Sequence, residues 1–126
     1  MDYFSLHVDE QNKLLRVKAA GRVLKADAAD VINTARREAM KNDLNILYDL
    51  QAAKTTLTAF DWYELPRELE VFRTPTARRI RAGALISERD DVGNLKFFEN
   101  VLHNLGFNVK IFFHDEDAVR WLAKNS

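Results

Sequence analysis

The 126-residue chain contains no cysteine. This absence excludes disulfide bonds, zinc–thiolate sites, iron–sulfur clusters and cysteine nucleophiles. The sequence also has no net charge, because 19 basic residues balance 19 acidic ones. A neutral chain gives no global electrostatic reason to bind nucleic acid or an anionic membrane. We therefore expect no nucleic-acid partner.

Long apolar runs are missing as well. No uninterrupted run approaches the ~20 residues that a membrane-spanning helix needs, and no basic, apolar signal region follows Met1. The sequence therefore predicts a cytoplasmic protein without stable membrane insertion.

Glycines are few and scattered singly, so no glycine-rich phosphate loop is present. The three histidines, His7, His103 and His114, belong to three different predicted elements, and no two of them have ligand spacing on one helix. No serine lies in a nucleophile-elbow pattern. We expect no metal site, no cofactor and no enzymatic activity.

What the sequence does contain is a regular succession of strand and helix patterns. Residues 3–8 and 14–19 alternate apolar and polar side chains around a turn-like cluster, Asp9 to Asn12. This pattern predicts an N-terminal antiparallel hairpin with one face in the core, which Gly21 ends.

The rest of the chain alternates helices and strands. The predicted helices are 27–42, 58–73, 91–106 and 116–125, and the predicted strands are 45–50, 80–86 and 107–113. Such alternation after a hairpin indicates a single α/β domain over residues 1–126, with a mixed sheet of about five strands and four helices.

Residues typical of helix ends and the apolar faces of the segments support these helices. Asp27 and Asp115 are plausible N-caps, and Gly106 stands where a left-handed C-cap is expected. In the first helix the apolar face is predicted to exclude Arg36. Pro66 should kink the second helix or split it into two pieces.

The element order, the strand ending Tyr48-Asp49-Leu50 and the terminal segment 112-FFHDEDAVRWL-122 resemble the STAS-type fold. The similarity covers nearly the whole chain and is closest to the SpoIIAA-like branch of small bacterial proteins. It implies that all four helices, or most of them, lie on one side of the sheet. It also implies a non-catalytic regulatory or protein-interaction module.

The same resemblance directs attention to Thr58. Anti-sigma factor antagonists of this fold carry Asp-Ser-Ser-Gly after the third strand, and the phosphorylated serine falls on Thr58 here. The preceding Asp falls on Leu57, and the following Ser-Gly falls on Ala59-Phe60. Only a hydroxyl remains, so the resemblance implies a module without the usual phosphoserine switch. Thr58 is either an N-cap or a partner-docking or phosphoacceptor residue.

Four aromatic residues form the second group of candidates: Phe60, Trp62, Tyr63 and Phe72. The spacing of residues 60, 63 and 72 predicts one buried helix face, and Trp62 lies off that face, where it would mark an interface or the edge of a cavity. In a SpoIIAA-like protein the kinked helix 58–73 would be a movable lid. A small apolar, lipid-like ligand between this helix and the sheet is the alternative function.

Arginines make the third group. Arg78, Arg79 and Arg81 precede or begin a strand and are candidates for binding an anion or an acidic partner; the alternative is a solvated loop. The predicted partner is thus a protein or a small apolar ligand. A homodimer is a further expectation, because an antiparallel edge strand and exposed aromatic residues favour pairing.

Overall fold

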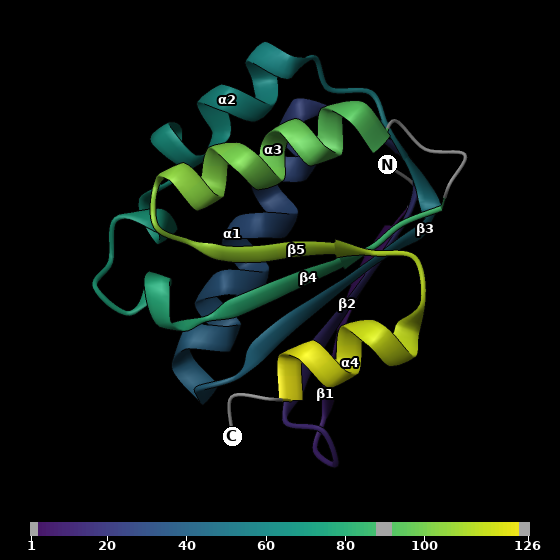
Figure 1. Cartoon of the computed structure of the whole chain (residues 1–126), viewed down its shortest axis with the longest axis vertical. Coiled ribbons are helices and arrows are strands. Elements are labelled where there is room, and N and C mark those ends of the chain that lie inside the picture. The colour runs from purple at the N-terminus through teal and green to yellow at the C-terminus, as the bar shows by residue number, and fades with distance from the viewer. Residues whose placement is uncertain (1–2, 88–91, 124–126) are drawn as a thin grey trace.

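The computed structural model describes residues 3–87 and 92–123. It contains one five-stranded sheet in the order β1-β2-β3-β4-β5. The strands are β1 (Tyr3–Asp9), β2 (Leu14–Val23), β3 (Asn45–Thr55), β4 (Arg81–Leu85) and β5 (Asn108–Phe112). Strand β1 pairs antiparallel with β2, and every later pair is parallel. The predicted hairpin and mixed sheet are confirmed (Figure 1).

Four helices connect and cover these strands. They are α1 (Lys25–Asn42), α2 (Ala59–Glu68), α3 (Val92–Asn104) and α4 (Asp115–Ala123), with two short 3₁₀ turns, η1 (Glu70–Phe72) and η2 (Ala77–Arg79). Residue 91 of the third predicted helix and residues 124 and 125 of the fourth lie outside the described residues.

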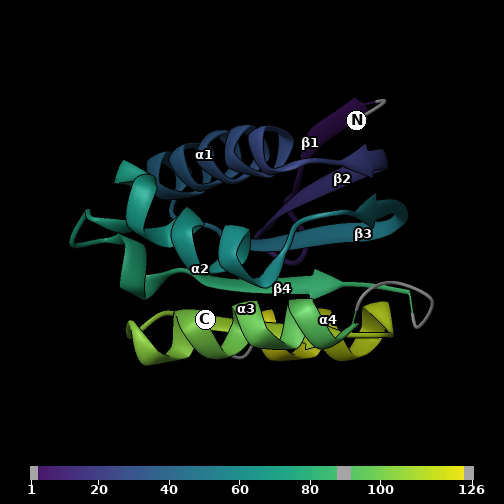
Figure 2. The same cartoon turned by 90° about the horizontal axis from the view of Figure 1, so that it is seen from above.

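The helices lie on both faces of the sheet. Helices α1, α2 and α3 cover one face, and α4 covers the other (Figure 1). Viewed from above, α1 lies on the β1–β2 side and α2 lies between α1 and the β4 side (Figure 2). The expectation that helices lie mostly on one side is met by three of the four.

Strand alternation explains the two cores. Adjacent residues of a strand point to opposite faces of a sheet. Leu15 and Ile46 are buried in the core under α1–α3, whereas Leu14 and Leu47 are buried with α4. Because both faces are covered, these strands read as apolar runs rather than as alternating patterns.

Two strands are longer than the sequence predicted. Strand β2 continues through Gly21, which has a φ of 88°, to Val23, and β3 continues past residue 50 to Thr55. The two extensions pair with each other after a register shift between Lys18 and Ala20. Gly21 is therefore a residue of an irregular, extended strand pair and not the end of the hairpin.

The helix ends differ from the predictions in three places. The first helix begins at Lys25, and Asp27 lies in its first turn, where its carboxylate accepts a hydrogen bond from the Leu24 amide at 3.0 Å. Asp115 is the first residue of α4 rather than its cap. The second helix ends at Glu68 and is followed by η1, so it is split, which is one of the two predicted outcomes; the break falls at Leu69, whose backbone is extended, and not at Pro66.

Candidate functional site

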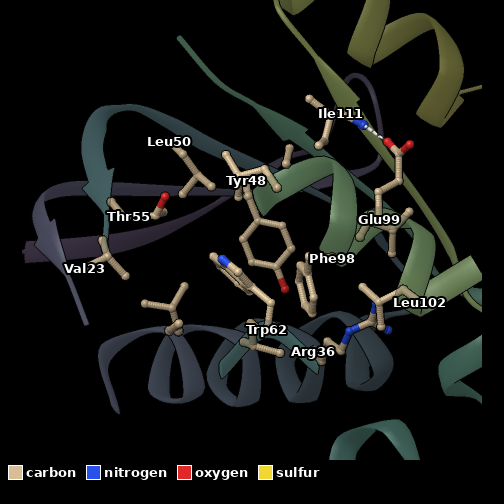
Figure 3. Close-up of a pocket in the computed structure, with 18 of the residues that line it drawn as sticks. Val23, Arg36, Tyr48, Leu50, Thr55, Trp62, Phe98, Glu99, Leu102 and Ile111 are labelled. Atoms are coloured by element: carbon tan, nitrogen blue, oxygen red, sulfur yellow. Dashed lines mark hydrogen bonds between the residues drawn. The ribbon is translucent and has the colours of Figure 1, made fainter. Parts of the chain in front are cut away.

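An apolar cavity lies between the sheet and the helices α1, α2 and α3. Its volume is about 90 Å³, and nearly all of its lining is apolar. Tyr48 and Leu50 of β3 face it from the sheet, Trp62 comes from α2, and Phe98 comes from α3 (Figure 3). The cavity thus lies where the alternative function predicted a ligand, beneath the second helix.

Short side chains create this space. Ala19, Ala82 and Ala84 line the cavity from the sheet, and Ala28 lines it from α1. A methyl group at each facing position leaves a gap that larger aliphatic residues would fill. The gap is bounded by the Trp62 and Phe98 rings, whose centroids are 4.5 Å apart.

Two polar atoms in this apolar lining have no hydrogen-bond partner among the described residues. They are the hydroxyl oxygen of Tyr48 and the indole Nε1 of Trp62, and both atoms are buried. An unsatisfied buried polar group lowers stability by about 1–3 kcal/mol. Burial raises the pKa of Tyr48 to about 12, against an opposite effect of the Arg36 charge. Tyr48 is therefore a neutral hydroxyl near pH 7.

The third polar group of the lining is Arg36 of α1, whose side chain is only 2% exposed. Its guanidinium lies 4.5 Å from the centre of the Phe72 ring, and its Nη1 donates to the Ala77 carbonyl across a long 3.4 Å. Within residues 3–87 and 92–123 no carboxylate forms an ion pair with it. Burial lowers the pKa of Arg36, but a guanidinium remains charged near pH 7.

One carboxylate is among the lining residues of the cavity, but it interacts with groups outside it. Glu99 of α3 accepts a hydrogen bond from the Ile111 amide of β5 at 2.7 Å (Figure 3). Its other oxygen lies 3.6 Å from the Lys96 ammonium. The cavity therefore contains a buried cation and two unpaired polar groups but no free anion among the described residues.

Thr58 is the N-cap of α2. Its hydroxyl accepts a hydrogen bond from the Asp61 amide at 3.1 Å, and the Asp61 carboxylate accepts one from the Thr58 amide at 2.9 Å. This reciprocal pair is a capping box. Thr58 is exposed, so its proposed docking or phosphoacceptor role stays a prediction beside the cap that the geometry shows.

The inner and outer faces of α2 were predicted the wrong way round. Trp62 is only 4% exposed and lines the cavity, whereas Phe60 is 65% exposed and Tyr63 is 42% exposed. Leu65 and Pro66 continue the buried face. The prediction failed because it placed Phe72 on the same helix, and the break after Glu68 ends that periodicity. Phe72 is nevertheless buried and lines the cavity.

The predicted arginine group does not converge on one point. Arg78 donates to the Leu105 carbonyl at the end of α3, at 3.3 and 3.1 Å, and Arg81 donates to the Trp121 carbonyl of α4 at 3.1 Å. Arg79 is exposed. Cations at helix C-termini stabilise the helix dipole, which accounts for Arg78 and Arg81 without an anion.

Arg36 and Tyr48 were the residues that the sequence interpretation missed. Arg36 was placed outside the apolar face of α1, yet it follows Ile32 by four residues and precedes Ala39 by three. That spacing puts it at the edge of the buried face. Tyr48 lies in an apolar strand, and its sequence context gave no sign that its hydroxyl would be unpaired.

Comparison with known proteins agrees with the fold. The structure is similar to that of an uncharacterized protein of the DUF3478 family with a SpoIIAA-like fold from Shewanella loihica PV-4. The two share 17% sequence identity over 95% of this chain and 92% of that chain, with a TM-score of 0.53. No family model and no curated protein matches the sequence. The chain has the SpoIIAA-like fold that the sequence resemblance predicted.

The described residues contain neither a membrane-spanning helix nor a cluster of metal ligands. None of the helices in this part of the chain has the length and apolar character required to span a membrane. The same residues contain no cluster of three or more His, Asp or Glu side chains suited to hold a metal ion.

Proposed function

We propose that the protein is a non-catalytic binding module that holds a small, mainly apolar ligand in the cavity beneath α2. The observation that carries this proposal is the apolar space of about 90 Å³ between the sheet and the helices α1, α2 and α3. Protein interiors contain few voids larger than a water molecule, and an empty void deprives its lining of van der Waals contacts. A bound apolar ligand would restore those contacts.

The cavity size limits the ligand. An engineered apolar cavity of roughly 150 Å³ takes up benzene, so about 90 Å³ suits a body no larger than a small ring or a short chain. A longer ligand requires α2 to move outward. Helix α2 is held to the start of α1 by Lys25, whose ammonium lies 3.1 Å from both Glu64 and Glu68. Such partly exposed ion pairs contribute little, so the cost of this movement comes mainly from exposing the buried side chains of Trp62 and Leu65.

A matched pair of variants tests the proposal. Ala28→Leu places a larger side chain in the cavity, and Ala26→Leu makes the same change on the exposed side of α1. We expect benzene to raise the melting temperature of the wild type and of Ala26→Leu but not of Ala28→Leu. Filling the void should also stabilise Ala28→Leu itself by about 1 kcal/mol.

The readout is thermal unfolding with and without benzene, together with native mass spectrometry of protein purified from cells without denaturation. A retained small-molecule mass in the wild type that disappears in Ala28→Leu supports the proposal. If benzene leaves the wild-type melting temperature unchanged, or raises that of all three proteins equally, the cavity is not a binding site.

A second candidate function is a regulatory or protein-interaction module that docks a partner through α2. The observation that favours it is the exposed aromatic pair Phe60 and Tyr63, close to the exposed cap Thr58. Exposed aromatic residues are frequent anchors at interfaces. Phe60→Ser should abolish recovery of a specific partner, and Phe97→Ser, on the exposed side of α3, should not. Equal recovery with both variants would reject this surface.

A further inference from the structure

The cavity contains a positive charge that the described part of the protein does not neutralise. The guanidinium of Arg36 has five N–H donors, and its one hydrogen bond to a described residue is the long contact to the Ala77 carbonyl. Its other neighbours are the Phe72 and Phe107 rings, with centroids 4.5 and 5.7 Å away. Buried charges in proteins are normally paired with an opposite charge.

The two unpaired polar groups of the lining can both donate a hydrogen bond. The Trp62 Nε1–H is a donor only, and the Tyr48 hydroxyl, which is neutral near pH 7, can donate as well. The Tyr48 hydroxyl points toward the helix layer from which Trp62 and Arg36 come (Figure 3). Together with Arg36, these groups are donors without an adequate acceptor, whereas the two acceptor side chains of the lining, Glu99 and Thr55, already interact with other groups.

We propose that the ligand is a small monocarboxylic acid whose carboxylate binds Arg36 and the Tyr48 hydroxyl and whose apolar body fills the rest of the cavity. This inference rests on the proposed function and adds the chemical class of the ligand. A carboxylate has about four acceptor positions on two oxygens and matches the planar guanidinium. It would supply the missing charge, while the alanines and the Trp62 ring would contact the apolar body.

The cavity volume favours a carboxylate over larger anions. A phosphate ester would carry about two charges, and one guanidinium is the only cation among the described lining residues. With about 90 Å³ available, a carboxylate leaves space for a short chain or a small ring. We therefore expect the affinity for straight-chain acids to be highest at a short chain length.

The test compares matched acid and amide probes. Butanoate, hexanoate and octanoate are titrated against the full chain by calorimetry at pH 7, beside butanamide, hexanamide and octanamide, which have nearly the same shape and no charge. We expect the best acid to bind about tenfold or more tightly than its amide, because a charged hydrogen-bonded pair in an apolar site is worth more than a neutral one.

Arg36→Met is the decisive variant, and Arg37→Met, on the exposed side of α1, is its control. We expect Arg36→Met to lose the acid-over-amide preference and to unfold at an equal or higher temperature than the wild type, because an apolar side chain of similar length replaces an unpaired charge. Arg37→Met should retain the preference. Tyr48→Phe gives a second readout, with a several-fold weaker binding of the acid and a smaller loss for the amide, whose neutral carbonyl accepts a weaker hydrogen bond.

The outcomes separate the two proposals. If acids and amides bind equally, and Arg36→Met changes neither, the carboxylate inference is wrong while the apolar cavity remains a binding site. If benzene, acids and amides all fail to bind, both proposals are overturned. If Arg36→Met does not fold, Tyr48→Phe decides: an unchanged acid-over-amide ratio in that variant rejects the inference.

Discussion

At the scale of single residues, the candidate site consists of polar groups in an apolar setting. Arg36, Tyr48 and Trp62 each place nitrogen or oxygen atoms where residues 3–87 and 92–123 offer them little or no hydrogen bonding. Each therefore lowers the stability of the free protein. Such groups are typical of sites that gain their missing partner from a ligand.

The first prediction follows for Tyr48. Tyr48→Phe removes the unpaired hydroxyl and keeps the ring, so the free energy of unfolding should rise by about 1 kcal/mol. Urea denaturation monitored by circular dichroism measures this change. Tyr63→Phe, at an exposed position, should change stability by less than about 0.5 kcal/mol. A less stable Tyr48→Phe protein would show that the hydroxyl has a partner.

The sequence predicted only some of the residues of the candidate site. It identified Trp62 and Phe72, which line the cavity, but it placed Trp62 on the exposed side and excluded Arg36 from the buried face. A buried arginine is rare, so a single sequence argues against it. Whether a hydroxyl is paired depends on contacts between distant elements, which periodicity does not encode.

At the scale of elements, α2 is the segment on which both candidate functions depend. Its buried side closes the cavity with Trp62, and its exposed side carries Phe60 and Tyr63. The capping box of Thr58 and Asp61 fixes the start of this short helix. Pro66 and the break at Leu69 fix its end.

The second prediction concerns this cap. Thr58→Ala removes the hydroxyl that accepts the Asp61 amide, so the free energy of unfolding should fall by about 1 kcal/mol. Thr34→Ala, at an exposed position inside α1, is the control and should not destabilise the protein, since alanine favours helix interiors. Chemical denaturation measures both. Equal stability of Thr58→Ala and the wild type would refute the role of the cap.

The third prediction concerns the turn between β1 and β2. The pKa of Asp9 is lowered from 3.8 to about 2 because its carboxylate accepts hydrogen bonds from Asn12 and Arg16. A lowered folded-state pKa stabilises the protein fully above the unfolded pKa, and this contribution is lost as the pH falls toward 2. Stability should therefore decrease between about pH 4 and pH 2.

Asp9→Asn tests this dependence. At pH 7 the variant should be less stable than the wild type by about 1 kcal/mol, and its melting temperature should fall less between about pH 4 and pH 2. Asp30→Asn, at an exposed position of α1, keeps the hairpin intact and should show the wild-type profile. Parallel pH profiles for Asp9→Asn and the wild type would mean that Asp9 does not cause the loss.

At the scale of the whole molecule, the sequence predicted the architecture better than its details. The number and order of strands and helices are confirmed because each has its own apolar periodicity. The lengths of β2 and β3 were underestimated, since their outer halves pair with each other at polar and glycine positions that resemble a loop. No local sequence pattern predicted that α4 would lie on the face of the sheet opposite the other three helices.

The arrangement of the layers also explains where a ligand can bind. Helix α4 packs on its face of the sheet through a compact set of residues that includes Ala118 and Leu122, and a side chain at Gly83 would already contact Leu122 at 3.4 Å. The other face is covered by three helices and retains the cavity. The two tryptophans of the protein lie on opposite sides of the sheet. Trp62 lines the cavity, and Trp121 belongs to α4.

These two indole groups allow the most direct test of a ligand site beneath α2. In ¹⁵N-labelled protein titrated with butanoate, we expect the Trp62 indole N–H resonance to shift progressively and to saturate, while the Trp121 resonance remains unchanged. Equal shifts of both resonances, or a shift of Trp121 alone, would contradict ligand binding in the cavity.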